Sequence, residues 1–106
     1  MSNPTVSVII PVYNAQDGIK QCLDSLLNQS FTDFEIILLN DGSTDNSLEV
    51  VKKYAAVNDF IRVIDKENEG VAKTRNKGIQ LANGKYIVFI DNDDFVDSDY
   101  LERFYN

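Results

Sequence analysis

The sequence contains no histidine, a single cysteine and no apolar run longer than a β-strand. The absence of histidine removes most zinc chemistry and the usual general base for a serine or cysteine nucleophile. Cys22 has no partner for an internal disulfide, which fits a reducing compartment, and its place on an apolar helix face indicates a buried side chain rather than a nucleophile. Because no apolar run is long enough, we expect no signal peptide and no membrane span in this sequence. We therefore expect a cytoplasmic chain.

Basic residues are also scarce. The chain has 10 Lys and Arg against 17 Asp and Glu, for a net charge of −7. Proteins bind nucleic acid through clustered Lys and Arg, so this balance argues against nucleic acid as a partner. The length of 106 residues allows one domain, and the hydrophobic content of 43% is sufficient for a core.

The hydrophobic pattern alternates between strands and helices. Four short apolar runs predict β-strands at residues 6–10, 35–39, 61–64 and 86–90. An amphipathic stripe predicts a helix over 19–27, and similar patterns follow the other three strands. The order predicts an α/β fold, with an open, mostly parallel, Rossmann-like sheet and helices on both faces. The run at 86–90 has the continuous apolar character of a strand covered on both faces.

The later helices carry less regular apolar stripes. We expect the third helix to end at Asn83-Gly84, a common C-terminal cap, and the last to be capped by Asp97-Ser98. The side chains expected to face inward on these helices are Leu48, Val51, Tyr54, Ala55, Ala72, Ile79, Ala82, Tyr100, Leu101 and Phe104.

Candidate site residues follow three of the four predicted strands. Tyr13 and Asn14 follow the first strand, and Asn40 and Asp41 follow the second. The fourth strand runs into three carboxylates, Asp91, Asp93 and Asp94. Parallel strands end at one edge of the sheet, where ligands of open α/β sheets bind. With the first strand central, Tyr13 offers a flat face for a base and Asp41 an acceptor for a ring N–H or a ribose hydroxyl. The clustered acids repel one another unless Mg²⁺ or Mn²⁺ lies between them and substrate phosphates.

Each residue also has a purely structural interpretation. Asp41 belongs to a good turn sequence, Tyr13 suits a packed loop aromatic, and Asp93-Asp94 suits a turn before the last helix. Lys73 and Arg75, early in the third helix, add positive charge beside a diphosphate, although Arg75 also suits a solvated helix face. The conjunction of these groups at one sheet edge favours a site.

Four ordered segments carry a resemblance to a known family: 8–14 (VIIPVYN), 40–45 (NDGSTD), 68–70 with 75–78 (NEG and RNKG), and 89–94 (FIDNDD). Through them the chain resembles the N-terminal, nucleotide-binding half of a family 2 glycosyltransferase of the GT-A fold. The resemblance covers essentially the whole chain.

The resemblance implies transfer of a sugar from a nucleotide-sugar, very often a UDP-sugar, to an acceptor saccharide or lipid-linked glycan, as in polysaccharide biosynthesis. It implies Mg²⁺ or Mn²⁺ on the diphosphate, with Asp93 as ligand and Asp94 as the alternative, and inversion at the sugar. The residues it places at the donor are Pro11, Tyr13, Asn14, Asp41, Arg75, Asp91, Asn92 and Asp93.

The resembled family carries its acceptor half, with the general base, C-terminal to these segments, whereas this sequence ends at Asn106. We therefore expect residues 1–106 to be a donor-binding fragment, truncated before the acceptor half, that holds no catalytic base and does not transfer sugar. Missing C-terminal regions would supply any link to the inner face of a membrane. Apolar surface exposed by the truncation predicts self-association.

Three other functions compete with this interpretation. A phosphatase of the haloacid dehalogenase type also uses an Asp-x-Asp after a strand, and a response-regulator receiver also gathers acids around Mg²⁺. Both place acids after the first strand, where this chain has the segment 11–14 (PVYN). A non-catalytic nucleotide-binding or interaction module is the third alternative.

Overall fold

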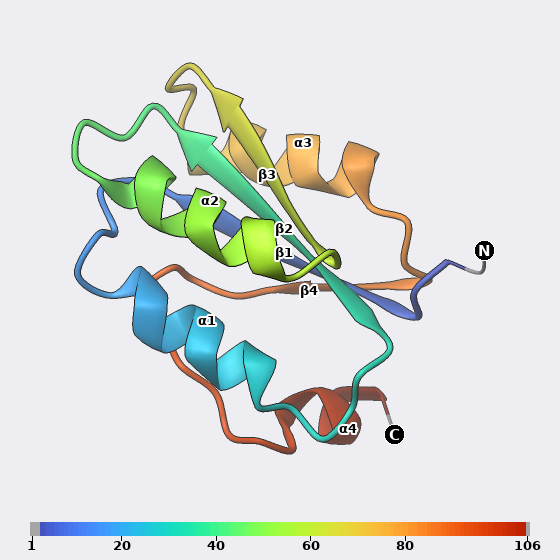
Figure 1. Ribbon diagram of the computed structural model, residues 1–106. Coiled ribbons are helices and arrows are strands. Elements are labelled where there is room, and N and C mark those ends of the chain that lie inside the picture. Colours follow the sequence, from blue (N-terminus) through green and yellow to red (C-terminus); the bar gives the residue numbers. More distant parts are fainter. Residues whose placement is uncertain (1–2, 106) are drawn as a thin grey trace.

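The structure, a computed structural model, describes residues 3–105, so both ends of the expected fragment 1–106 lie outside the described residues. Strands and helices alternate along the whole described chain (Figure 1). The elements are β1 (Val6–Val12), α1 (Ile19–Leu27), β2 (Phe34–Asp41), α2 (Ser47–Val57), β3 (Ile61–Lys66), α3 (Val71–Leu81), β4 (Tyr86–Phe89) and α4 (Tyr100–Tyr105). None of the helices within residues 3–105 is long and apolar enough to cross a membrane.

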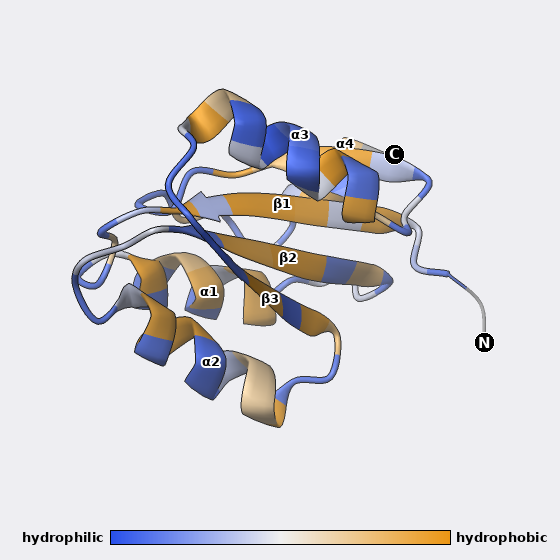
Figure 2. Ribbon diagram, turned by 90° about the horizontal axis from the view of Figure 1, so that it is seen from above, coloured by the Kyte–Doolittle hydropathy of each residue, from blue (hydrophilic) through white to orange (hydrophobic). Residues whose placement is uncertain are grey.

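The four strands form one sheet in the order β3-β2-β1-β4, and every pair is parallel. This arrangement confirms the predicted fold class, with β1 as an inner strand between β2 and β4. Figure 2 shows α1 and α2 on one face of the sheet and α3 on the other. The three loops that follow β1, β2 and β4 therefore emerge at a common edge.

The core has two parts of unequal size. Every residue of β1 and β2 is buried, as expected for strands covered on both faces. The larger cluster lies under α1 and α2 and includes the four apolar residues of α1 that point inward, Ile19, Cys22, Leu23 and Leu26. A smaller cluster of Ile9, Ile37 and Leu39 lies under α3.

The prediction for the inner face of α3 is wrong in part. Ile79 and Ala72 are exposed, and the buried residues are Thr74 and Gly78. The reason is a close helix–sheet approach, since a Cβ on Gly78 would lie 2.6 Å from Cγ2 of Ile9. Ala82 does pack against the smaller cluster, as predicted.

The prediction of a β4 covered on both faces is also wrong. Tyr86 and Phe89 are 42% and 43% exposed, while Val88 is buried. The cause is the edge position of β4, because Tyr86 and Phe89 lie on opposite faces of a strand with a neighbour on one side only, and α3 packs mainly on β1 and β2.

One helix end and one predicted inward residue differ from expectation as well. Helix α3 ends at Leu81, and the extended Ala82 caps it in place of Asn83-Gly84. Gly84 serves close packing instead, since a Cβ there would lie 2.6 Å from the backbone nitrogen of Ser7. In α4, Leu101 is buried as predicted but Phe104 is exposed.

Candidate functional site

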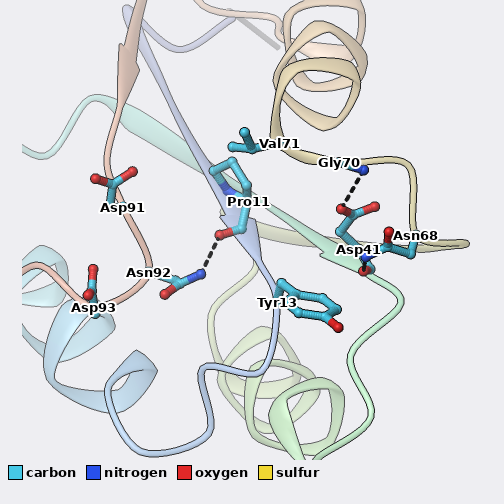
Figure 3. A pocket seen from close by; sticks show the side chains of 9 residues that line it. All are labelled: Pro11, Tyr13, Asp41, Asn68, Gly70, Val71, Asp91, Asn92 and Asp93. Atoms are coloured by element: carbon cyan, nitrogen blue, oxygen red, sulfur yellow. Dashed lines mark hydrogen bonds between the residues drawn. The ribbon is translucent and has the colours of Figure 1, made fainter.

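The carboxyl edge of the sheet holds a cavity of about 320 Å³, built from the ends of β1 and β2, the loops after β1, β3 and β4, and the start of α3 (Figure 3). In Figure 3, Tyr13 and Asp41 lie on one side and Asp91 and Asp93 on the other. The lining residues are Pro11, Tyr13, Asp41, Asn68, Gly70, Val71, Asp91, Asn92 and Asp93. Six of the predicted donor residues therefore share one cavity, whereas Asn14, Arg75 and Asp94 are not among its described lining.

Asp41 ends β2 and is 4% exposed, yet it lines the cavity. Its Oδ1 accepts hydrogen bonds from Lys66 Nζ at 2.9 Å and Glu69 N at 2.8 Å, and its Oδ2 accepts one from Gly70 N at 3.1 Å. Burial raises the pKa of Asp41, but the hydrogen bonds from Lys66 and Glu69, together with the nearby Thr74 hydroxyl, outweigh burial and hold the pKa below its usual range. Asp41 is thus a buried, ionised acceptor that also anchors the loop before α3.

Tyr13 follows β1 and is 49% exposed, so its ring face is available at the cavity mouth. Asn92 lies across from it and donates from Nδ2 to the carbonyl of Pro11 at 3.0 Å. This bond ties the loop after β4 to the end of β1. The two sides of the cavity are therefore held together by the protein itself.

Asn14 braces two loops rather than lining the cavity. Its backbone has φ of 48°, a left-handed conformation that asparagine tolerates. Its Oδ1 accepts from Thr44 N at 2.8 Å, and its own N–H donates to Ser43 Oγ at 3.0 Å. The side chain thereby joins the loop after β1 to the loop after β2.

Arg75 reaches the acidic side of the site. One of its terminal nitrogens lies 3.3 Å from Asp91 Oδ1, and its guanidinium carbon lies 5.6 Å from the centre of the Phe89 ring. Both partners of this ion pair are substantially exposed, so it contributes about 1 kcal/mol or less. Lys73 instead lines a separate groove between β3 and α3, away from the position expected for a diphosphate.

Asp91, Asp93 and Asp94 lie close together in a turn, with Asp94 N donating to the carbonyl of Asp91 at 3.1 Å. Their negative charges add to burial in raising the pKa of the nearby Cys22 thiol to about 12. Within residues 3–105, no group of three or more His, Cys, Asp or Glu side chains is arranged to hold a metal ion. One or two of these carboxylates, with phosphate oxygens completing the shell, match the oxygen ligands that Mg²⁺ and Mn²⁺ take.

Four residues at or beside the cavity have no role that the sequence predicts. Asn68, Gly70 and Val71 line it, and Lys66 holds Asp41 from behind. The segment 68–70 was part of the resemblance, and Gly70 has φ 92° and ψ 161°, a conformation confined to glycine. Lys66 gives no sequence signal of its own, but the register of β3 places it opposite Asp41.

Comparisons with known proteins agree with this geometry. The family model described as glycosyl transferase family 2 matches residues 7–106. A putative glycosyltransferase, EpsH, of Bacillus subtilis (strain 168) is 45% identical over 97% of this chain and 30% of its own length. An uncharacterized glycosyltransferase, YibD, of Escherichia coli (strain K12) is 49% identical over 91% of this chain and 28% of its own length. The chain thus spans about 30% of these relatives.

Two solved structures share the fold. S. aureus TarS 1-349 in complex with UDP-GlcNAc has a TM-score of 0.88 and 33% identity, over 95% of this chain and 30% of that one. The mannosyltransferase PcManGT from Pyrobaculum calidifontis, in complex with GDP-Man and Mn²⁺, has a TM-score of 0.81 and 26% identity, over 90% of this chain and 29% of that one. These matches favour the family 2 interpretation over the phosphatase and receiver alternatives. The chain belongs to glycosyl transferase family 2.

Proposed function

We propose that this chain is the donor-binding part of a glycosyltransferase that uses a nucleoside diphosphate sugar, with UDP-sugars as the preferred class. The single observation that carries the proposal is the cavity itself, which has an aromatic face and a buried carboxylate on one side and a carboxylate turn on the other. This spacing of groups suits a base, a ribose and a diphosphate in that order. The UDP-GlcNAc bound by TarS and the GDP-Man bound by PcManGT support the same class of ligand.

On the base side, Tyr13 would stack on the ring and Asp41 would accept a ring N–H. The ring of Tyr13 is half exposed and Asp41 is ionised, so both groups are ready for these contacts. Pro11 would form part of the cavity wall, and the 3.0 Å hydrogen bond from Asn92 to the Pro11 carbonyl would hold the acidic turn in place against it. Asn14 would act indirectly, by holding the loop that carries Tyr13.

On the diphosphate side, Asp91 would face the ribose and Arg75 the nucleotide, with Asp93 as the metal ligand and Asp94 as its alternative. A divalent ion bound there would stabilise the negative charge of the leaving diphosphate. Without a cation, each carboxylate–phosphate pair 4 Å apart would cost roughly 4 kcal/mol at an effective dielectric constant of about 20. We infer that nucleotide binding depends on Mg²⁺ or Mn²⁺.

The remaining parts of the reaction are proposals about the whole protein. We propose that the general base and the acceptor site, for a saccharide or lipid-linked glycan, lie outside residues 1–106 and that transfer inverts the sugar carbon. The free, buried Cys22 supports a cytoplasmic setting. We further propose that the isolated chain self-associates through β4.

Titration calorimetry of UDP, with and without Mn²⁺, tests the donor site. The expected result is binding that requires Mn²⁺ and that is lost in the double variant Asp93→Ala, Asp94→Ala. Asp59→Ala is the matched control, because this exposed carboxylate lies just before β3, at the other end of the sheet. Binding that is equally strong without metal, or in the double variant, would contradict the assignment of the acidic turn.

A further inference from the structure

Lys66 is a largely but not fully buried cation at the end of β3, with its side chain 9% exposed. Its Nζ lies 2.9 Å from Asp41 Oδ1 and 2.9 Å from Glu69 Oε1. The same nitrogen lies 3.0 Å from the carbonyl of Glu67 and 3.3 Å from Thr74 Oγ1. A single ammonium group therefore joins the end of β2, the loop before α3 and the first turns of α3.

The bonds to Asp41 leave little of its carboxylate free. An ionised carboxylate has about four acceptor positions, two on each oxygen. Lys66 and the Glu69 N–H occupy both positions on Oδ1, and the Gly70 N–H occupies one on Oδ2. The Thr74 hydroxyl helps to lower the pKa of Asp41, but it is paired with Lys66 Nζ at 3.3 Å and makes no described hydrogen bond to the carboxylate. One position on Oδ2 therefore remains for a ligand in the cavity that Asp41 lines.

Lys66 is also the cation that offsets the burial of Asp41. The charged groups around this carboxylate are Lys66 itself and Glu69, with Lys73 of α3 acting on Glu69. The carboxylates of Asp91 and Asp93 lie across the cavity. Without Lys66, only backbone N–H and hydroxyl donors would offset the rise in the pKa of Asp41 that burial causes.

We propose that Lys66 is a positioning and specificity-determining residue of the donor cavity, because it occupies one oxygen of Asp41 and leaves a single acceptor position for the base. This inference rests on the proposed function. Uracil offers one ring N–H and satisfies that position. Guanine presents N1–H and its amino group side by side and needs two adjacent free acceptors, so the site should favour uracil.

Calorimetric titrations of UDP and GDP in Mn²⁺ test this role. The unmodified chain should bind UDP at least about tenfold more tightly than GDP. Lys66→Met should weaken UDP binding about tenfold, because Asp41 loses the cation that keeps its carboxylate ionised, and should shrink the preference over GDP. Lys77→Met is the control. Lys77 is an exposed lysine that lines the same groove between β3 and α3 as Lys66 but has no bond to Asp41, so both affinities should stay unchanged.

The pH profile separates this role from a general loss of structure. UDP affinity of Lys66→Met, relative to the unmodified chain, should fall as the pH drops from 7.5 to 5.5, because the buried Asp41 then takes up a proton. Lys66→Arg, which keeps the charge, should restore a flat relative profile. If Lys66→Met does not fold, as judged by circular dichroism, Lys66→Gln removes the charge with less disruption and should show the same pH dependence.

A double-mutant cycle completes the test. In an Asp41→Asn background, Lys66→Met should weaken UDP binding no further, because Lys66 acts through Asp41. Nucleotide binding with an unchanged preference and a flat relative pH profile in Lys66→Met would refute the role of Lys66 alone. Absence of UDP and GDP binding in the unmodified chain would instead refute the proposed donor site.

Discussion

Glu35, at the other end of the sheet from the cavity, is the centre of a buried polar network whose removal has a calculable cost. Its Oε2 accepts hydrogen bonds from Ser7 Oγ at 2.6 Å and Asn83 N at 2.7 Å, and its Oε1 lies 3.4 Å from Arg62. The Ser7 hydroxyl in turn accepts from Gly84 N at 2.8 Å. One carboxylate thus connects β2, β1 and the turn that leads into β4.

Glu35→Ala removes the acceptor, and the cost at each of its donors depends on whether water can replace the lost hydrogen bond. Ser7 is fully buried, so its hydroxyl loses a charged hydrogen bond with no water to replace it, at about 1–3 kcal/mol. The Asn83 N–H is on an exposed residue and recovers part of its loss in water. Arg62 is partly exposed and contributes about 1 kcal/mol or less. The sum is a loss of about 3 kcal/mol, a large part of the roughly 5–15 kcal/mol that stabilises a typical domain.

Urea unfolding followed by circular dichroism measures this loss, and thermal unfolding should show a Tm lower by about 12–24 °C. Glu67→Ala is the matched control, since that exposed carboxylate takes no part in the described side-chain hydrogen bonds. UDP affinity of the folded variant should match the unmodified chain, because the network lies at the opposite end of the strands. A Glu35→Ala variant within about 0.5 kcal/mol of the control would refute the reasoning.

Two further predictions concern the β4 edge and the thiol. If two copies pair antiparallel through β4, centred on Val88, Lys85 of one copy would face Asp91 of the other and the half-exposed Phe89 would be covered. Light scattering should then show concentration-dependent dimers, and Lys85→Glu should weaken them. A monomer at high concentration would contradict self-association. Burial, with the acidic turn, raises the pKa of Cys22 to about 12, so a disulfide reagent at pH 8 should react only after urea unfolding, and rapid labelling of the native chain would contradict its burial.

The alternation of elements and the inner place of β1 were predictable because they depend on short-range patterns and general topology rules. The runs at β1 and β2 are mostly apolar and fully buried, since both faces are covered. The convergence of Tyr13, Asp41 and Asp91 then follows from parallel pairing alone. A rule about strand ends can therefore assemble most of a site from residues far apart in the sequence.

The errors arose where distances between elements decide the outcome. Thr74 and Gly78 face the sheet on α3 because small residues allow a close approach, which an apolar stripe does not reveal. The exposure of Phe89 depends on which strands α3 covers. Lys66 resembles any strand-terminal lysine until the register with Asp41 is known. Its role is a property of tertiary contacts.

The pairing of β1 with its two neighbours also has a kinetic consequence. Val6 pairs with Phe34 on one side and with Tyr86 on the other. Closing the longer loop, the one between β1 and β4, costs roughly 0.9 kcal/mol more in loop-closure entropy, and β4 is the last of the four strands in chain order. The carboxylate turn therefore joins the sheet after β1, β2 and β3 can already have associated. Nucleotide affinity during refolding should then appear in the slowest phase, and would serve as a time-resolved reporter of the final folding step.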